Sequence, residues 1–377
     1  MRRFFLFIAL AVTVAAVDAK NVPENTDDRT VCGQLEKCVR RVVAIPDIEG
    51  YKTLKCDFHM HTVFADAHVS PAGRVREAWQ DGLDAIAMSE HFAVHKSPGI
   101  KLKDYNLPIN LAVKEGKKWG FLVVPAVEIT RTKPFGHMNA LFIKDPTVFE
   151  ENRYQTDENG KLLRDKDGNR IPTPTEMEDF KKAEAQGAFM LWNHPGWPDR
   201  KSTLYPLHKQ LIKEGRIHAV ELFNGSEWYP KVLDWFDEYK LPMMANSDIH
   251  DTSRFIYGNQ IRPMTLVFAK EYTLESLREA LFAGRMVAFF ENKIAGDEQY
   301  VSQLVAASLK VQVVDEKKGV LVVTNVSDIP FATLFGDHMN PVLFRPRSAI
   351  RVTVPKGTVL DFTNCYVGRQ TLKKEIW

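Results

Sequence analysis

Short apolar runs alternate with helix-like stretches between residues 51 and 292 of the chain. Glycines follow the ends of the helical patterns, at positions where a left-handed residue commonly ends a helix. Regular alternation of strands and helices is typical of a parallel α/β sheet or barrel. We therefore expect one large α/β domain over this part of the chain. The glycines are Gly82, Gly120, Gly187, Gly215 and Gly284.

The predicted elements follow directly from these patterns. Strands are expected at 54–58, 85–88, 121–127, 138–143, 188–192, 218–223, 242–245, 265–268 and 286–290. Helices are expected at 71–81, 108–119, 175–186, 204–214, 229–239 and 274–283. The first helix has Ser70 as a plausible N-cap and Pro71 at its first position, where proline needs no hydrogen-bond partner.

Three parts of the chain depart from this alternation. Residues 20–50 are a polar N-terminal segment, and residues 144–174 contain turn signals that predict a hairpin-like insertion within the 51–299 domain. A calcium loop in this insertion is the alternative, but the ligand spacing is incomplete. Residues 300–377 are expected to form a small all-β domain without helices and with a structural role. Its predicted strands are 309–314, 319–326, 332–334, 349–354 and 358–361.

Clusters of histidine and acidic residues lie at the ends of the predicted strands. Because alternate side chains of a strand face the same way, a His-x-His or Asp-x-His pair presents two ligands on one side. The carboxyl ends of parallel strands meet at one edge, where α/β folds place their active sites. Imidazoles and carboxylates gathered there predict a site for several divalent cations. The clusters are His59-Met60-His61 with Asp66, Glu90-His91, Glu128 with His137, His194, and Asp248-Ile249-His250.

The alternative for each residue is a structural role, as a hydrogen-bonded histidine or a paired carboxylate. This alternative is strongest for His91 and His137, each a lone histidine at its position. Five clusters in one pattern favour the metal site over five independent structural roles. The remaining histidines do not follow the pattern and are expected to be ordinary surface or partly buried residues. They are His68, His95, His208, His218 and His338.

On these motifs the chain resembles the polymerase and histidinol phosphatase (PHP) family. The resemblance covers roughly residues 51–292 and implies a distorted seven-stranded β/α barrel. Glu90 is a departure, because many members have Asp there, but it lies outside the ligand set. The motifs are Asp57-Phe58-His59-Met60-His61-Thr62 with Asp66, Ser89-Glu90-His91, Pro125-Ala126-Val127-Glu128, Gly136-His137, Asn193-His194-Pro195 and Ser247-Asp248-Ile249-His250.

The resemblance also implies a ligand set that is the catalytic site, with three divalent cations. Because these ligands are harder than thiolate, manganese, iron and zinc are all acceptable, and the carboxylate share favours manganese or iron. The first group is His59, His61 and Asp248, which Glu128 bridges to a second group of His137 and His194, and the third group is Asp66, His91 and His250. Such a site implies a metallophosphoesterase, in which the cations neutralise the phosphoryl oxygens and activate water for in-line attack.

Basic residues just after the ligands are the predicted contacts of the substrate phosphate. Arg131 follows Glu128 and Arg254 follows His250, while Lys96 and Arg200 are weaker candidates. The alternative for each is a solvated surface charge. Three tryptophans near the ligand loops predict either core packing or a stacking surface for the leaving group. They are Trp192, Trp197 and Trp228.

The first nineteen residues have the features of a secretory signal peptide. Arg2 and Arg3 precede an apolar run over residues 4–17, which is too short to span a membrane, and small residues follow at 17–19. An N-terminal membrane anchor is the alternative. We expect an exported protein, periplasmic or secreted, with no membrane span after cleavage. Export permits a disulfide between Cys32 and Cys38, and Cys56 is expected to be a buried free thiol.

Together these observations predict an exported phosphoesterase that hydrolyses small-molecule phosphodiesters or organophosphate esters. The formal net charge of +2 gives no broad basic field, so no stable nucleic-acid complex is expected. The alternatives are a phosphomonoesterase of the same family, a non-catalytic metal- or phosphate-binding protein, and a metal-dependent amide hydrolase. The last lacks an evident metal-bridging lysine at a strand end.

Overall fold

A computed structural model describes residues 39–91, 104–149, 157–159, 161–164, 166, 176–336 and 341–377. The predicted signal peptide lies outside the described residues, as do Cys32, Cys38, Lys96, His95 and His338. The same is true of most of the predicted insertion and of the calcium-loop alternative. Of the insertion, the structure defines the short helix η2 (Pro146–Phe149) and a few isolated residues.

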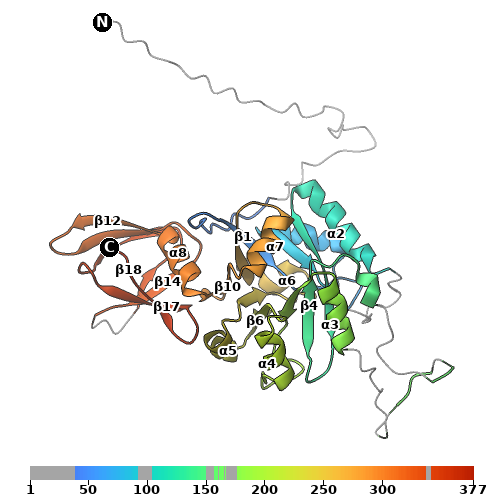
Figure 1. Ribbon diagram of the computed structural model, residues 1–377. Coiled ribbons are helices and arrows are strands. Elements are labelled where there is room, and N and C mark those ends of the chain that lie inside the picture. The colour runs from blue at the N-terminus through green and yellow to red at the C-terminus, as the bar shows by residue number, and fades with distance from the viewer. Residues whose placement is uncertain are drawn as a thin grey trace, which may run out of the picture. The chain divides into compact units, whose positions relative to one another are not determined.

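Helices pack around the strands of the ligand-bearing part of the chain (Figure 1). In the ladder that runs from β10 to β8, seven strands point in one direction and two point against them. The seven are β1 (Lys52–Asp57), β2 (Ala85–Met88), β3 (Leu122–Thr130), β5 (Phe189–Trp192), β6 (Ala219–Asn224), β8 (Met243–Asn246) and β10 (Met286–Phe290). The reversed strands are β4 (His137–Leu141) and β9 (Met264–Ala269). The hydrogen-bonded order is β10-β9-β1-β2-β3-β4-β5-β6-β8. β4 and β9 therefore begin at the edge where the seven parallel strands end.

The mixed α/β class is confirmed, but the expectation of a purely parallel arrangement is wrong for β4 and β9. Only residues 131–136 separate β3 from β4, which is too short for the crossover that a parallel neighbour requires. The ladder of backbone pairs does not join β8 to β9. Instead the Thr265 hydroxyl donates to the carbonyl oxygen of Ala245, and its oxygen accepts from the Ala245 amide. A fully closed seven-stranded barrel stays a prediction.

Beyond β1 and β8 the chain segments pair directly. Met60 and Ile249 form a parallel bridge, and the amide of Asp248 donates to the carbonyl oxygen of His59 at 2.8 Å. This pairing brings the His-x-His and Asp-x-His segments side by side.

The helices agree with the predicted ones to within about two residues. Ser70 caps α1 by accepting from the amide of Gly73, and Gly120 ends α2 in the left-handed conformation. The short helix α6 was not predicted, because five residues show too little periodicity. The helices of this part are α1 (Pro71–Gln80), α2 (Asn106–Trp119), α3 (Glu176–Ala185), α4 (Pro206–Lys213), α5 (Lys231–Tyr239), α6 (Ser253–Tyr257) and α7 (Leu274–Phe282).

The C-terminal part consists mainly of strands, as predicted, but it also contains a helix. α8 (Glu298–Ser308) was missed, although Asp297 caps it and Val301, Leu304 and Val305 form its buried stripe. The strands are β11 (Lys293–Gly296), β12 (Leu309–Asp315), β13 (Val320–Asn325), β14 (Phe331–Leu334), β15 (Val342–Phe344), β16 (Ser348–Thr353), β17 (Val359–Tyr366) and β18 (Thr371–Glu375). The predicted domain boundary at residue 300 stays a prediction.

The C-terminal strands are hydrogen-bonded to the ligand-bearing part of the chain. β11 pairs with β10 on one side and with β17 on the other, so one ladder runs through both parts. In addition, Arg369 in the β17–β18 turn forms an ion pair with Asp234 of α5, with Nη2 2.6 Å from Oδ2. Cys56 and Cys365 are buried free thiols, which confirms the prediction for Cys56.

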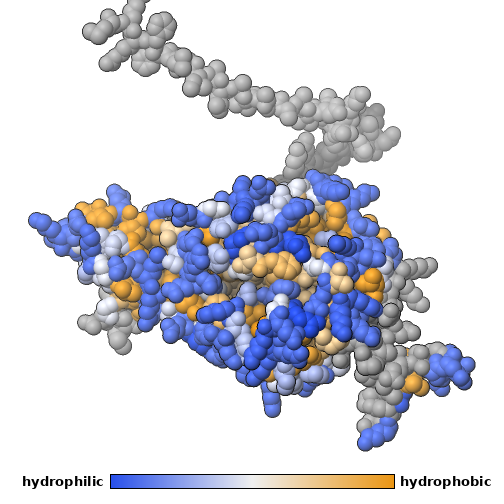
Figure 2. Space-filling model, in the orientation of Figure 1, coloured by the Kyte–Doolittle hydropathy of each residue, from blue (hydrophilic) through white to orange (hydrophobic). Residues whose placement is uncertain are grey.

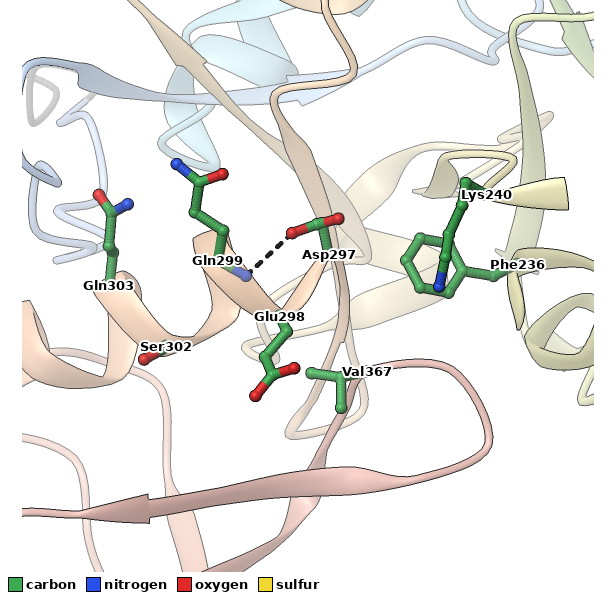
Figure 3. A pocket seen from close by; sticks show the side chains of 8 residues that line it. All are labelled: Phe236, Lys240, Asp297, Glu298, Gln299, Ser302, Gln303 and Val367. Carbon is green, nitrogen blue, oxygen red and sulfur yellow. Dashed lines mark hydrogen bonds between the residues drawn. The ribbon is translucent and has the colours of Figure 1, made fainter. Parts of the chain in front are cut away.

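The surface of the described part is mixed. The face in Figure 2 is mostly hydrophilic over the helices, with smaller apolar areas between them. Among the described residues, no helix has the length and the apolar character needed to cross a membrane. One cavity, of about 610 Å³, lies between the end of α5, the start of α8 and the β17–β18 turn (Figure 3). Its lining includes Lys240, Asp297 and Glu298, and none of the predicted ligands.

Two histidines outside the ligand set are expected to make stability depend on pH. His208 is 2% exposed and lies against Trp192, and the amide of Met190 donates to Nδ1 of His218. Burial lowers the pKa of both to about 4, whereas an unfolded histidine has a pKa of about 6.5. The unfolded chain therefore binds more protons between these two values. The stability that depends on these two neutral imidazoles is fully present above pH 6.5 and is lost as the pH drops towards 4.

Replacing His218 by Asn should reduce this dependence, because the amide oxygen can still accept from Met190 but does not titrate. We expect the unfolding free energy of His218→Asn to fall less steeply than that of the wild type between pH 6.5 and 4. Urea denaturation of both proteins in the presence of chelator measures it. Parallel pH profiles would contradict the assignment.

Candidate metal centre

All nine predicted ligands lie at the edge where the parallel strands end. His59 and His61 follow β1, His91 follows β2, Glu128 lies near the end of β3, and His194 follows β5. Asp248 and His250 follow β8, and Asp66 lies in the loop between β1 and α1. His137 is the first residue of β4, whose reversed direction places its start at this edge. The reversal explains why this ligand begins its strand, whereas the other ligands lie near the end of a strand or after it.

Glu128 is the centre of the cluster. Its side chain is fully buried. Its Oε1 lies 2.9 Å from Nδ1 of His137, 3.5 Å from Nε2 of His194 and 3.6 Å from Nε2 of His59. Its Oε2 lies 2.6 Å from Nδ1 of His91 and 3.5 Å from Nε2 of His61. Burial alone would raise the pKa of Glu128, but His91 and His137 outweigh it and hold the pKa well below its ordinary value. This carboxylate is placed to bridge two cations.

Asp248 connects the two histidines of the first motif. Its Oδ1 lies 3.3 Å from Nε2 of His59 and 3.0 Å from Nε2 of His61. Its backbone has a φ of 48°, a left-handed conformation that costs a residue other than glycine about 1–3 kcal/mol. Such strain persists where the surroundings fix the conformation, as the bridge between Met60 and Ile249 does here.

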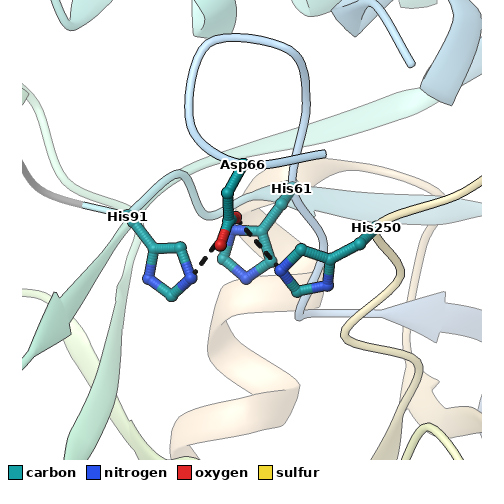
Figure 4. Close-up of side chains that lie close together, drawn as sticks. All are labelled: His61, Asp66, His91 and His250. Atoms are coloured by element: carbon teal, nitrogen blue, oxygen red, sulfur yellow. Dashed lines mark ion pairs between the residues drawn. The ribbon is translucent and has the colours of Figure 1, made fainter. Parts of the chain in front are cut away.

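A further group surrounds Asp66 (Figure 4). Its Oδ1 lies 3.1 Å from Nε2 of His250 and 3.6 Å from Nε2 of His91. The ring of His61 stacks on that of His91, with 4.1 Å between the ring centres. His61 therefore contacts both this group and His59. The predicted division into groups is therefore compatible with the geometry, and His61 lies between two of them.

The donor set fits divalent cations. Several of its buried polar atoms make no hydrogen bond, namely Nε2 of His59, both ring nitrogens of His61, Nδ1 of His194, Oε2 of Glu128 and Oδ1 of Asp248. Buried polar atoms normally have a partner, so this concentration needs an explanation. Four combinations of these residues offer three or four donor atoms within 4.8 Å of one another. Imidazole and carboxylate together suit manganese, iron or zinc.

Glu221 of β6 is a functional residue that the sequence analysis did not assign. It accepts hydrogen bonds from Nδ1 of His59 at 2.9 Å and from the amide of His194 at 2.7 Å. The side-chain amides of Asn224 and Asn246 also donate to it, at 2.7 and 3.0 Å. Because Nδ1 of His59 donates to Glu221, Nε2 is left to bind a metal. A charged residue inside an otherwise apolar strand was the available signal.

Two buried arginines hold the ligand loops together. Arg74 donates to the carbonyl oxygens of His61 at 2.8 Å and of Ile249 at 3.0 Å. Arg262 donates to Asp57 at 2.6 Å and to the hydroxyl of Ser247 at 2.8 Å. Arg74 thus connects the segment after β1 to the segment after β8, and Arg262 connects the last residue of β1 to that same segment.

Glu90 contacts the loop rather than the ligand cluster. It accepts from the amide and the hydroxyl of Thr62, and burial raises its pKa to about 7.

Both main candidates for phosphate contacts are engaged with other residues of the chain. The Arg131 side chain is 8% exposed and forms an ion pair with Asp179. Arg254 donates to Asn259 at 2.5 Å and lines a cavity that contains none of the nine ligands. The structure therefore does not bring Arg254 together with the ligands. Trp192 is a core residue stacked on Trp235 at 4.8 Å, as the packing alternative predicted. Trp197 is 53% exposed.

A cavity of about 460 Å³ opens next to the ligands, and we call it the ligand-side cavity. Asp248 and His250 form part of its wall, and Phe223, Ile256 and Tyr257 are apolar or aromatic neighbours. Its charged lining residues other than His250 are acidic, namely Asp248, Asp251 and Glu291. It is the natural position for a substrate that reaches the cluster.

Fold and site together define a metal-dependent hydrolase of α/β architecture. The chain is similar to the crystal structure of a two-domain protein from Bacteroides vulgatus that contains a predicted PHP-like metal-dependent phosphoesterase. The TM-score is 0.77 at 31% identity, over 91% of this chain and 99% of the other. The chain therefore belongs to the family of PHP-like metal-dependent phosphoesterases, as its motifs predicted.

Other matches are more distant. A candidate metal-dependent phosphoesterase from Bifidobacterium adolescentis has a TM-score of 0.43 at 16% identity, over 60% of this chain and 95% of the other. A lesion-specific endonuclease from Pyrococcus furiosus has a TM-score of 0.40 at 17% identity, over 65% of this chain and 59% of the other. No family model and no curated protein matches the sequence.

Metal binding should stabilise the folded protein, because the donors converge only in the native state. At a free metal concentration about 100-fold above the dissociation constant, each ion should add about 2.7 kcal/mol to the unfolding free energy. Denaturation of chelator-treated and manganese-reloaded protein, with elemental analysis, tests this. Equal stability and less than one metal per chain would contradict the site.

Glu221→Gln should weaken metal binding by about 10- to 100-fold. Glu221 accepts from four donors, and an amide replaces one accepting oxygen by an NH₂ group that faces them. Metal titration monitored by cobalt absorption measures the change, and Glu238→Gln on the exposed face of α5 is the control. A purely structural role would lower the stability of the metal-free protein and leave the metal affinity unchanged.

Proposed function

We propose that this protein is an exported, metal-dependent phosphodiesterase with three divalent cations. The observation that carries the proposal is the nine-residue cluster around Glu128, which opens into the ligand-side cavity. The grouping is Asp66, His91 and His250 for one cation, His137 and His194 for a second, and His59, His61 and Asp248 for a third, with Glu128 bridging. Manganese or iron is favoured by the carboxylate share, and zinc is compatible.

The chain's own residues position the reaction. Bound cations would neutralise the charge of the phosphoryl oxygens. They would also lower the pKa of a bound water towards neutral pH, so that it could act as the nucleophile. Asn193 donates to Oε1 of Glu128 at 3.0 Å and fixes the bridging carboxylate. Glu221 sets the orientation of the His59 ring. Gln260 and Ser226 provide hydrogen-bonding groups in the ligand-side cavity, and Phe223 and Ile256 form part of its apolar side.

The charge of the ligand-side cavity favours a diester over a monoester. Its lining contains Asp251 and Glu291 but no lysine or arginine. A phosphomonoester carries close to two negative charges at neutral pH, whereas a diester carries one. Acidic walls penalise the dianion more strongly, because like charges repel in a partly desolvated site. A phosphomonoesterase of the same family and a non-catalytic binder remain the competing functions.

Export is proposed on the N-terminal sequence alone. The pattern of residues 1–19 supports cleavage of a signal peptide and a periplasmic or secreted location. Sequencing the N-terminus of protein recovered from the periplasm or medium would test it. Retention of Met1 in the cytoplasm would contradict it. The proposed substrate is a small molecule, and the predicted absence of a nucleic-acid complex stays a prediction.

A comparison of two chromogenic esters tests the proposed reaction. Metal-reconstituted mature protein should hydrolyse bis(p-nitrophenyl) phosphate with a kcat/KM at least about 10-fold above that for p-nitrophenyl phosphate. His59→Ala should lose about 100-fold or more, since it removes a ligand that contacts both Glu128 and Asp248. A faster monoester would favour the phosphomonoesterase. No hydrolysis of either ester by metal-loaded protein would favour the binder.

A further inference from the structure

A second cavity, of about 670 Å³, lies beside the metal centre, between the loops that follow β5 and β6. It is separate from the ligand-side cavity, and we call it the basic cavity. Its character comes from six residues of the two loops and the start of α5. They are Trp197, Arg200, Lys201, Trp228, Tyr229 and Lys231.

The basic cavity lies at the same edge of the strands as the ligands. The amide of Trp197 donates to the carbonyl oxygen of the ligand His194 at 2.8 Å. Tyr229 lines the basic cavity and is buried, and Gly196 lies against its ring. Burial raises the pKa of Tyr229, the hydrogen bond to Glu227 raises it further, and the charges of Glu221 and Asp248 make smaller contributions.

One hairpin separates the two cavities. β6 pairs with the short strand β7 (Glu227–Trp228), with Phe223 opposite Trp228. Phe223, Gly225 and Ser226 line the ligand-side cavity, whereas Glu227 and Trp228 line the basic cavity. A phosphodiester has two organic groups on one phosphorus, so a substrate held at the ligands could extend one group into each cavity.

The charges of the two cavities are opposite. The basic cavity has three cationic side chains and one carboxylate, that of Glu227, which accepts from the hydroxyl of Tyr229 at 2.5 Å. Within the described part of the chain, no carboxylate forms an ion pair with Arg200, Lys201 or Lys231. The Lys231 ammonium donates to the backbone carbonyl oxygen of Lys201 at 2.5 Å, which places it beside the loop that carries the other two cations. These cations are thus available to an anion.

The loop that carries two of the cations is fixed from inside. The carboxylate of Asp199 is buried and accepts from the amides of Lys201 and Thr203 and from the hydroxyl of Tyr205. Arg200 and Lys201 therefore stand on an ordered turn. Preorganised cations bind an anion at a smaller entropic cost than those on loose loops.

Two indole rings complete the basic cavity. Trp197 is 53% exposed, so its ring is accessible for stacking. Trp228 lies under Nζ of Lys293 at 5.3 Å. Aromatic rings beside cations are the combination that binds planar, anionic groups, through stacking and charge.

We propose that the basic cavity binds one arm of the phosphodiester substrate, and that this arm carries a planar ring and a second phosphate group. The proposal rests on the proposed diesterase function and specifies its substrate class. Arg200, Lys201 and Lys231 bind the second phosphate, and Trp197 stacks on the ring. The uncharged arm occupies the ligand-side cavity, whose walls are acidic and apolar.

Two substrates that differ by one phosphate test the charge. They are the p-nitrophenyl ester of thymidine 5′-phosphate and the same ester with a 3′-phosphate. Wild-type protein is expected to prefer the 3′-phosphorylated ester by at least about 10-fold in kcat/KM. The triple variant Arg200→Gln, Lys201→Gln, Lys231→Gln should reduce this ratio to within about twofold. These side chains are exposed, so the variant should fold.

Lys240→Gln is the matched control, because Lys240 follows the other end of α5 and lines the cavity of Figure 3, where its ammonium lies 4.9 Å from the Phe236 ring centre. It should keep the wild-type ratio. Trp197→Ala should lower kcat/KM about fivefold or more for both thymidine esters and leave their ratio unchanged. An absent preference in the wild type, or a ratio that survives in the triple variant, would overturn the proposal.

A binding measurement separates this proposal from the proposed function. Calorimetry with thymidine 3′,5′-bisphosphate on chelator-treated protein reports the basic cavity without catalysis. Binding by wild type and Lys240→Gln, with at least a tenfold loss in the triple variant, supports the subsite even if no ester is hydrolysed. No binding by the wild type, or equal binding by the triple variant, overturns it.

Discussion

The fully buried carboxylate of Glu128 is the constraint on which the rest of the site depends. Five imidazoles lie within 3.6 Å of its two oxygens. A carboxylate in this position costs several kcal/mol unless positive charge and hydrogen bonds compensate for the lost hydration. The strands therefore have to bring their histidines to one point. The reversal of β4 serves the same end, because it adds His137 without another crossover helix.

Buried polar groups around this centre hold the ligands and their segments in place through hydrogen bonds. Glu221 connects β6 to His59 and His194, while Arg74 and Arg262 join the end of β1 and the segment after it to the segment after β8. Each of these contacts spans residues far apart in the sequence. Ligand orientation is consequently set by packing between strands, and the loops at the edge need only carry the side chains.

The sequence was informative where a pattern is local. Apolar runs located the strands, and the motif from His59 to His250 contained every ligand that the structure brings together. Contacts between distant segments were not predictable in this way. The direction of β4, the partnership of Arg131 with Asp179 and the burial of His208 against Trp192 all depend on tertiary packing. α8 is different, because its cap at Asp297 and its apolar stripe are local patterns in the sequence. The helix was missed because the surrounding residues have a strand pattern.

The pairing of β11 with both β10 and β17 has a consequence for how this chain can be divided. Residues after 300 are hydrogen-bonded to the part before them, since β17 pairs with β11 along one side. A chain cut at this point would expose the unpaired amides and carbonyls of β11 to solvent, and an uncovered strand of this kind recruits other chains. Covering this edge of β11 is thus one role that the pairing with β17 can serve.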